Sequence, residues 1–247
     1  MAFCEKQLSA LLQGICPAAA TVVFENVGFT NVSARELAPK LAGNFLVAAN
    51  SQSAGRGSHG RQFHSPEGGF YLTAALRDVP FSLPVTAAAG VAAAEALQQV
   101  CGRAVALKWV NDIRFGGKKA GGILCERTGD GAVLVGLGLN LQTPAGGFPK
   151  ELAAIAGALD IDPACCNALA AAFYASLTAL LQAPQSIVPR YSALCETLGQ
   201  HIRFELGGKT LTGTALSVDG QTALTVKLDD GGSVVLQSGE ASVRPCV

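Results

Sequence analysis

A polar, glycine-rich segment between two apolar runs constrains this chain most strongly. Residues 52–65 read Q-S-A-G-R-G-S-H-G-R-Q-F-H-S, with three glycines and two arginines. This composition does not suit the interior of a helix or strand, so we expect a loop between strands at 45–49 and 70–76. Glycine lets a backbone approach a ligand closely, and arginine offers a planar donor fork for phosphate or carboxylate. The segment therefore predicts an anion-binding loop, with a flexible surface hairpin as the alternative.

Composition bounds the classes of protein to which the chain can belong. Its 247 residues are 49% hydrophobic and 15% charged, enough apolar surface for a sizeable core. Lys+Arg and Asp+Glu number 18 each, so no broad basic face is expected and we predict no nucleic-acid partner. Any positive charge that takes part in ligand binding must then come from a local group of residues.

Cysteine spacing and targeting signals favour a cytoplasmic protein with reduced thiols. The eight cysteines form no C-x-x-C pair and no Cys/His cluster at zinc spacing, so no metal site is expected. The N-terminus M-A-F-C-E-K-Q lacks the pattern of a signal peptide, and too few residues precede the first strand for a DNA-binding module. We also expect no membrane contact, because no apolar stretch of ~18–20 residues free of charges and turn signals stands out.

The order of predicted elements indicates an α+β fold in two parts. Strands are expected at 21–26, 45–49, 70–76, 105–108, 113–115, 120–126 and 132–141. Helices are expected at 5–12, from N-caps at Thr30-Asn31 to about 38, and at 83–100, 163–181 and 185–198. Short alternating segments follow at 202–206, 210–217, 224–228 and 233–237, separated by glycine turns. We predict a domain at 1–199 and a small SH3-like β-barrel at 200–247.

Three further stretches carry candidate chemistry. They read K-W-V-N-D at 108–112, K-K-A-G-G-I-L-C-E at 118–126 and G-L-G-L-N at 136–140. Glycines inside an apolar strand indicate either a ligand or a closely packed helix against the backbone. Asp112 and Lys119 lie across a glycine turn, so a hairpin would bring them together. An aspartate there can orient a nucleophile or accept a proton, and lysines can neutralise phosphate charge; an ordinary surface ion pair is the alternative.

Several common catalytic patterns are missing from the sequence. It contains no G-x-x-x-x-G-K-S/T phosphate loop, no G-x-S-x-G elbow and no plausible Ser-His-Asp set among three histidines. Trp109, the single tryptophan, is expected in the core, and His59 and His64 are expected to face solvent. The candidate chemistry is thus confined to the glycine-containing stretches.

In this order, and with S-G-E-A-S-V-R at 238–244, these stretches resemble the biotin–protein ligase family. Its usual patterns are G-R-G-R-x-G-R, K-W-P-N-D, K-(x)-G-G-I-L-x-E and G-x-G-x-N, and the resemblance covers about residues 21–244. It implies a mixed-sheet catalytic domain related to lipoate ligases and class II synthetases, followed by an SH3-like domain. It also implies a form of the family without a DNA-binding repressor module.

The resemblance implies a two-step ligation. Biotin and ATP, accompanied by Mg²⁺, would give biotinyl-5′-AMP and pyrophosphate, and biotin would then pass to a lysine of a biotin carboxyl carrier domain. The implied catalytic residues are Asp112, Lys119 and Arg56. The implied biotin-binding residues are Thr30, Asn31, Gln52, Arg56, Gly57, Ser58, Lys119, Gly122 and Gly136. The implied nucleotide-binding residues are Gly55, Arg61, Lys108, Asn111, Gly138 and Asn140. A homodimer is left open.

This chain departs from the family patterns at three positions. Phe29 stands where serine is usual and removes a hydroxyl from the ureido end of the site. Ser58 replaces an arginine of the loop, which predicts faster loss of the adenylate, and Val110 replaces proline. Two alternatives follow: a lipoate or other acyl ligase, which an apolar Phe29 would suit, and a biotin-binding protein without catalysis.

Overall fold

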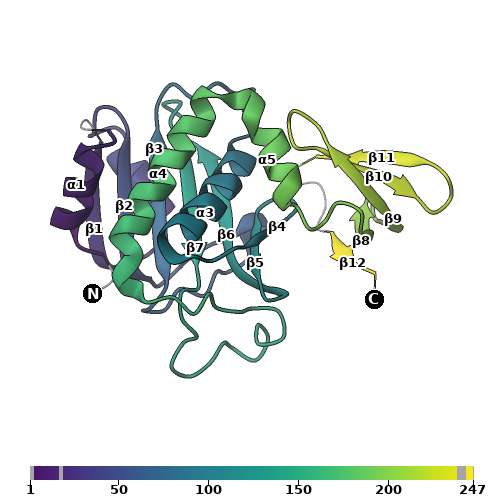
Figure 1. Ribbon diagram of the computed structural model, residues 1–247, viewed down its shortest axis with the longest axis horizontal. Helices are drawn as coiled ribbons and strands as arrows, with labels where there is room; N and C mark the ends of the chain where they lie inside the picture. The colour runs from purple at the N-terminus through teal and green to yellow at the C-terminus, as the bar shows by residue number, and fades with distance from the viewer. Residues whose placement is uncertain (1–2, 17–18, 238–242, 247) are drawn as a thin grey trace.

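Two β-sheets organise the chain, as the ribbon of the computed structural model shows (Figure 1). The structure describes residues 3–16, 19–237 and 243–246, so 238–242 of the terminal motif lie outside the described residues. The larger sheet is mixed and has the strand order β1-β2-β3-β7-β6-β5-β4, with β1 and β2 parallel and the other neighbours antiparallel. Its strands are β1 Ala20–Val27, β2 Phe45–Gln52, β3 Phe70–Leu76, β4 Ala106–Lys108, β5 Asp112–Phe115, β6 Lys118–Arg127 and β7 Val133–Leu139.

Helices cover both faces of this sheet, which explains why the central strand β3 is buried along its whole length. On one face lie α1 Glu5–Gln13, α3 Val85–Cys101, α4 Cys166–Gln182 and α5 Ile187–Leu194. On the other face lies α2 Thr30–Leu37. Successive side chains of β2 serve the two cores, since Leu46 belongs to the first cluster and Val47 to the second.

The long helix α3 is confirmed, with small shifts at its ends. Pro84 occupies the N-cap position, so the helix begins at Val85 instead of residue 83. At its C-terminus Gly102 adopts a left-handed conformation with φ of 62° and donates its N–H to Gln98 O. The alanines between these ends let α4 approach closely, which gives the largest helix–helix contact in the core.

The expectation that no apolar stretch is long enough to span a membrane is wrong. Pro163–Gln182 forms a 20-residue helical segment with a mean hydropathy of 1.6, which by length and composition alone could cross one. Half of its most apolar window is buried in the protein, where Phe173 and Tyr174 are fully covered. A core helix meets the same criterion, because burial against other helices selects the same side chains.

The C-terminal part forms a second, antiparallel sheet with the order β11-β10-β9-β8-β12. Its strands are β8 His201–Leu206, β9 Lys209–Val218, β10 Leu224–Leu228, β11 Ser233–Leu236 and β12 Arg244–Pro245. Four of them match predicted segments, whereas the two-residue β12 was not predicted because no pattern marks so short a strand. Among the described residues the ladder runs from β11 to β12 without closing, so the barrel expected from the sequence is an open sheet here.

Trp109 holds the two sheets together, in keeping with its expected place in the core. It is 5% exposed, and its peptide bond to Val110 is cis. Its backbone N–H donates to Thr197 Oγ1 at 3.0 Å, and its indole Nε1–H donates to the carbonyl oxygen of Thr222 at 2.8 Å. The turn at Thr222 in the smaller sheet is thereby fixed to the end of β4.

Replacing Trp109 with phenylalanine should weaken this junction. Trp109→Phe leaves the buried Thr222 carbonyl unpaired and removes packing volume, so the free energy of unfolding should fall by about 1–3 kcal/mol. Urea unfolding followed by circular dichroism measures it. Leu216→Ala, at a side chain that is 53% exposed, is the control and should change stability by less than about 0.5 kcal/mol. Equal effects of the two substitutions would contradict this account of the junction.

Candidate functional site

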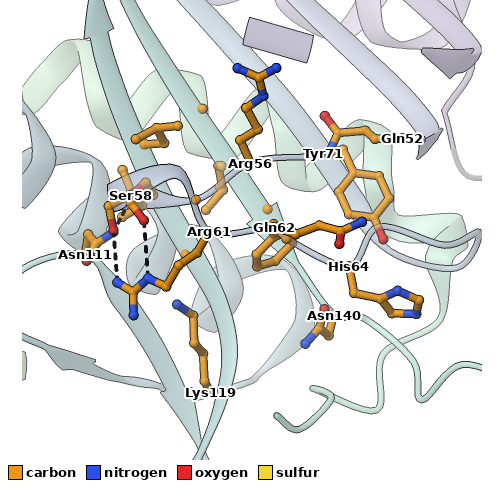
Figure 2. Close-up of a pocket in the computed structure, with 18 of the residues that line it drawn as sticks. Gln52, Arg56, Ser58, Arg61, Gln62, His64, Tyr71, Asn111, Lys119 and Asn140 are labelled. Atoms are coloured by element: carbon orange, nitrogen blue, oxygen red, sulfur yellow. Dashed lines mark hydrogen bonds between the residues drawn. The ribbon is translucent and has the colours of Figure 1, made fainter. Parts of the chain in front are cut away.

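One cavity gathers most of the candidate residues (Figure 2). It lies over β6 and β7, between the 52–65 segment and residues 148–156, and has an empty volume of about 1030 Å³, part of it open to solvent. Its predicted members are Thr30, Gln52, Arg56, Gly57, Ser58, Arg61, Asn111, Lys119, Gly122, Gly136, Gly138 and Asn140. Four candidates do not line it: Asn31, Gly55, Lys108 and Asp112.

The predicted loop is a hydrogen-bonded hairpin that folds over the cavity. Gln52 ends β2 because parallel pairing with β1 extends that strand three residues beyond its predicted end. Beyond it, Phe63 N–H donates to Gly55 O at 2.9 Å and Gly57 N–H donates to Arg61 O at 2.8 Å. Gly55 is buried, and a Cβ there would lie 2.7 Å from Phe63 O. Gly55 is therefore needed to close the hairpin.

The two glycines of β7 allow close approach by side chains of different origin. Asn31 of α2 presses on Gly136, so at that position the helix-packing alternative holds. The ring of Phe63 lies over Gly138, where a Cβ would come within 2.7 Å of the ring. At Gly138 the floor of the cavity is thus strand backbone covered by an aromatic ring.

One end of the cavity is uncharged and hydrogen-bonded to α2. The expected N-caps are wrong: Phe29 is the N-cap residue and has no capping side chain, and Thr30 is the first helical residue. Gln52 Oε1 instead accepts from Thr30 N–H at 2.9 Å and from the Thr30 hydroxyl at 3.1 Å. Asn31 is fully buried between α2 and the sheet, where its Nδ2 donates to Glu126 Oε2 at 2.8 Å. It does not line the cavity.

The other end is cationic. Lys119 Nζ forms an ion pair with Asp112 Oδ1 at 2.5 Å, as their spacing predicted. Arg61 Nε donates to Ser58 O at 3.3 Å, and Figure 2 shows its guanidinium close to Ser58 and Lys119 while Arg56 leaves the hairpin in another direction. Two cations and one carboxylate leave a net positive charge at this end. Such a site favours an anionic ligand.

Lys108 lies outside this cavity, in a second one beside the smaller sheet that Arg114 and Arg244 also line. Burial lowers the pKa of Lys108 below its ordinary value, Asp112 raises it, and the neighbouring cations Arg114, Lys119 and Arg244 lower it further. Lys108 and Asp112 are register partners across β4 and β5. Asp112 thus stands between the two groups of cations.

Sequence reasoning missed the residues that form the apolar walls. Tyr71 and Phe63 line the cavity, and so does His64, which corrects the expectation that this histidine faces solvent. Phe148, Leu152 and Ile155 form the opposite wall at a helical spacing that was a usable signal. This segment is attached to the cationic end, since Lys119 N–H donates to Ile155 O at 2.8 Å and Gly157 N–H donates to Lys119 O at 2.9 Å.

Within residues 3–16, 19–237 and 243–246, no three or more His, Cys, Asp or Glu side chains come together in a group that could hold a metal ion.

Comparison with known proteins places the chain among ligases. The Biotin/lipoate A/B protein ligase family profile matches residues 29–141, and the Biotin protein ligase C terminal domain profile matches residues 197–244. A biotin–(acetyl-CoA-carboxylase) ligase of Mycobacterium tuberculosis is 32% identical over 214 residues, covering 79% of this chain and 77% of that protein. The enzyme of the same name from Paracoccus denitrificans is 43% identical over 121 residues, 45% of this chain.

The fold has solved counterparts. The biotin protein ligase of Aquifex aeolicus in complex with biotin and ATP superposes with a TM-score of 0.77 at 23% identity, covering 92% of this chain and 99% of that one. At this identity the likeness concerns the fold alone. The chain spans about half the length of the first curated relatives it matches, 50% for the Paracoccus enzyme and 44% for the Bacillus spizizenii protein.

Two adjacent glycines of β6 give a matched test of the site geometry. A Cβ on Gly121 would lie 2.6 Å from Gly138 O, whereas a Cβ on Gly122 would face the cavity 3.6 Å from Lys119. Gly121→Ala should therefore lower the free energy of unfolding by about 1–3 kcal/mol, because the β6–β7 ladder must move. Gly122→Ala should cost less than about 0.5 kcal/mol in the same urea titration. The opposite order would show that the ladder is not as close as described.

Proposed function

Because the chain belongs to the biotin/lipoate A/B protein ligase family, we propose that it is a biotin–protein ligase. It activates biotin with ATP to biotinyl-5′-AMP and pyrophosphate, then transfers biotin to a lysine of the carrier domain of a biotin-dependent carboxylase. The observation that carries this proposal is the polarity of the cavity. An uncharged amide end and a cationic end are joined by apolar walls, and this matches an acid with a polar ring, an apolar tail and a carboxylate.

The cationic end performs the chemistry in this proposal. Lys119 binds the carboxylate and the acyl phosphate, Arg56 joins it by turning its side chain in from the hairpin, and their charge stabilises the negative charge that develops as pyrophosphate leaves. Asp112 holds the Lys119 ammonium in place and accepts a proton from the acceptor lysine in the second step. The backbone at Gly57 and Ser58 covers the adenylate.

The nucleotide lies along β7 and the hairpin. Arg61, Asn111, Gly138 and Asn140 line that part of the cavity, with Gly55 closing the hairpin and Lys108 adding charge from behind Asp112. Mg²⁺ accompanies ATP and is held mainly by the phosphates, which fits a donor set without grouped carboxylates among the described residues.

The proposal extends to domains, partners and location. Residues 1–199 form the catalytic domain and residues 200–247 a C-terminal SH3-like domain that Trp109 anchors. The protein works in the cytoplasm on a carboxylase carrier and without nucleic acid, and a homodimer through an edge strand of the large sheet is compatible with this.

A second candidate is a lipoate or other acyl ligase, favoured by one observation. Phe29, in place of serine, puts an apolar ring at the amide end of the cavity. Biotin-dependent exchange of labelled pyrophosphate into ATP separates the candidates, with lipoate and octanoate as competing acids. Exchange with biotin alone supports the main proposal, exchange with lipoate alone supports the second, and no exchange supports a binding protein without catalysis.

Neighbouring lysines provide the matched control for this assay. Lys119→Gln removes the charge at the reacting end, so the exchange rate should fall by about 100-fold or more. Lys118→Gln changes an exposed lysine on the same strand and should stay within about threefold of the wild type. A Lys119→Gln variant that exchanges at the wild-type rate would remove this residue from the proposed chemistry.

Because Ser58 stands where the family has an arginine, we expect the enzyme to release biotinyl-5′-AMP readily. Ser58→Arg adds a cation beside the cavity and should slow release of biotinyl-5′-AMP by about tenfold, measured by trapping free adenylate in single-turnover reactions. Ser58→Gln is the control, since it adds length and hydrogen bonding without charge. Unchanged release from Ser58→Arg would sink the idea that the missing arginine matters for retention.

A further inference from the structure

A threonine hydroxyl lies fully buried at the centre of the large sheet, on β3 between β2 and β7. This residue, Thr73, is 0% exposed, and a buried hydroxyl is costly unless it is hydrogen-bonded. Its single proton is shared between Asn31 Oδ1 at 2.7 Å and Thr30 Oγ1 at 2.9 Å. Both acceptors belong to the first turn of α2, so Thr73 attaches this helix end to the sheet.

The orientation of the Asn31 amide follows from its other partners. Asn31 Nδ2 donates to Glu126 Oε2 at 2.8 Å and to Leu124 O at 3.3 Å. Carboxylate and carbonyl oxygens only accept, so the amide must turn its oxygen toward Thr73. Glu126 is in turn paired with Arg35 at 3.0 Å, which fixes the outer end of the network at the surface.

Gln52 lies at the end of this hydrogen-bond network nearest the cavity, and its amide is held in one orientation. Thr30 N–H, which can only donate, points at Gln52 Oε1 at 2.9 Å, and the Thr30 hydroxyl gives its own proton to the same oxygen. Ser65 Oγ donates to Phe63 O at 2.9 Å, so it must accept from Gln52 Nε2, which lies 2.9 Å away. Reversing the amide would break both contacts at once.

The fixed orientation decides what this end of the cavity offers a ligand. The Gln52 amide nitrogen has two protons, and Ser65 takes one of them. Among the described residues no second acceptor for Nε2 occurs, and Gln52 lines the cavity. The uncharged end therefore presents a hydrogen-bond donor, while the amide oxygen is turned away into α2.

Resting on the proposed function, we propose that Thr73 and Ser65 are positioning residues for head-group selection. They act through Gln52 by holding its nitrogen toward the cavity. The site then takes a head group with a carbonyl acceptor, a cyclic urea, in preference to a disulfide ring that offers no comparable acceptor. Neither residue lines the cavity: Thr73 is buried between β3 and α2, and Ser65, at the end of the hairpin segment, has 5% of its surface exposed.

Biotin binding to the full chain by titration calorimetry tests this directly. Thr73→Val keeps the shape of the side chain and removes the hydroxyl, and should weaken biotin binding by about tenfold. Thr73→Ser keeps the hydroxyl and should stay within about threefold of the wild type. In the pyrophosphate exchange assay the KM for biotin should rise with Thr73→Val, while kcat and the KM for ATP stay within about twofold.

Ser65→Ala, on the hairpin, provides a second variant in case Thr73→Val folds poorly. The head-group probe is 2-iminobiotin, whose protonated imino group donates where the biotin carbonyl accepts. The wild type should bind it at least about tenfold more weakly than biotin. Both Thr73→Val and Ser65→Ala should reduce this ratio, because each weakens the hold on Gln52: Ser65 accepts from its nitrogen, and Thr73 anchors Thr30, which donates to its oxygen.

The outcomes separate this inference from the function on which it rests. Wild-type exchange with biotin, together with unchanged biotin affinity and an unchanged iminobiotin ratio in Thr73→Val and Ser65→Ala, would overturn the positioning role and leave the ligase intact. A Thr73→Ser variant as weak as Thr73→Val would also overturn it, since bulk and not the hydroxyl would matter. A folded wild type that binds no biotin would remove both proposals.

Discussion

The close antiparallel ladder of β3, β7 and β6 is the constraint on which the rest of the structure depends. Cross-strand neighbours Gly122 and Gly138 face each other in register, and Gly121 has room only for a hydrogen against the β7 backbone. Because this surface carries so few β-carbons, α2 can press on one part and the hairpin on another. The ladder therefore supplies the floor of the cavity and fixes the elements that form its two ends.

The two ends differ in the way they are held. At the uncharged end, the orientation of Gln52 is set by hydrogen-bond direction. Thr30 N–H can only donate to its oxygen, and Ser65, which gives its proton to the Phe63 carbonyl, accepts from its nitrogen. At the cationic end, Asp112 holds Lys119 across a strand pair, and the remaining positive charge is open to an anionic ligand. A ligand with a neutral polar head and a negatively charged tail is therefore oriented before any reaction begins.

Much of the fold was predictable from the hydrophobic pattern of the sequence, and the predictions that were wrong have physical causes. Strand and helix runs were predicted within a few residues because their apolar periodicity is strong, as in β3 and α3. The N-cap of α2 was misplaced because Gln52, distant in sequence, takes the role of a capping side chain. The wall formed by Phe148 and Ile155 was missed because its segment forms consecutive turns instead of a regular helix, and its place is set by the backbone of Lys119.

The sequence by itself determined the class of fold, the family, and the pairing of Asp112 with Lys119, because these depend on local spacing and on motifs contiguous in the chain. Only the tertiary structure decided which candidates share a cavity. It buried Asn31 between α2 and the sheet, brought His64 and Tyr71 into the lining, and buried Thr73 against α2. The contacts of Thr73 with α2 join residues more than 40 apart in sequence, and no local pattern records such distances.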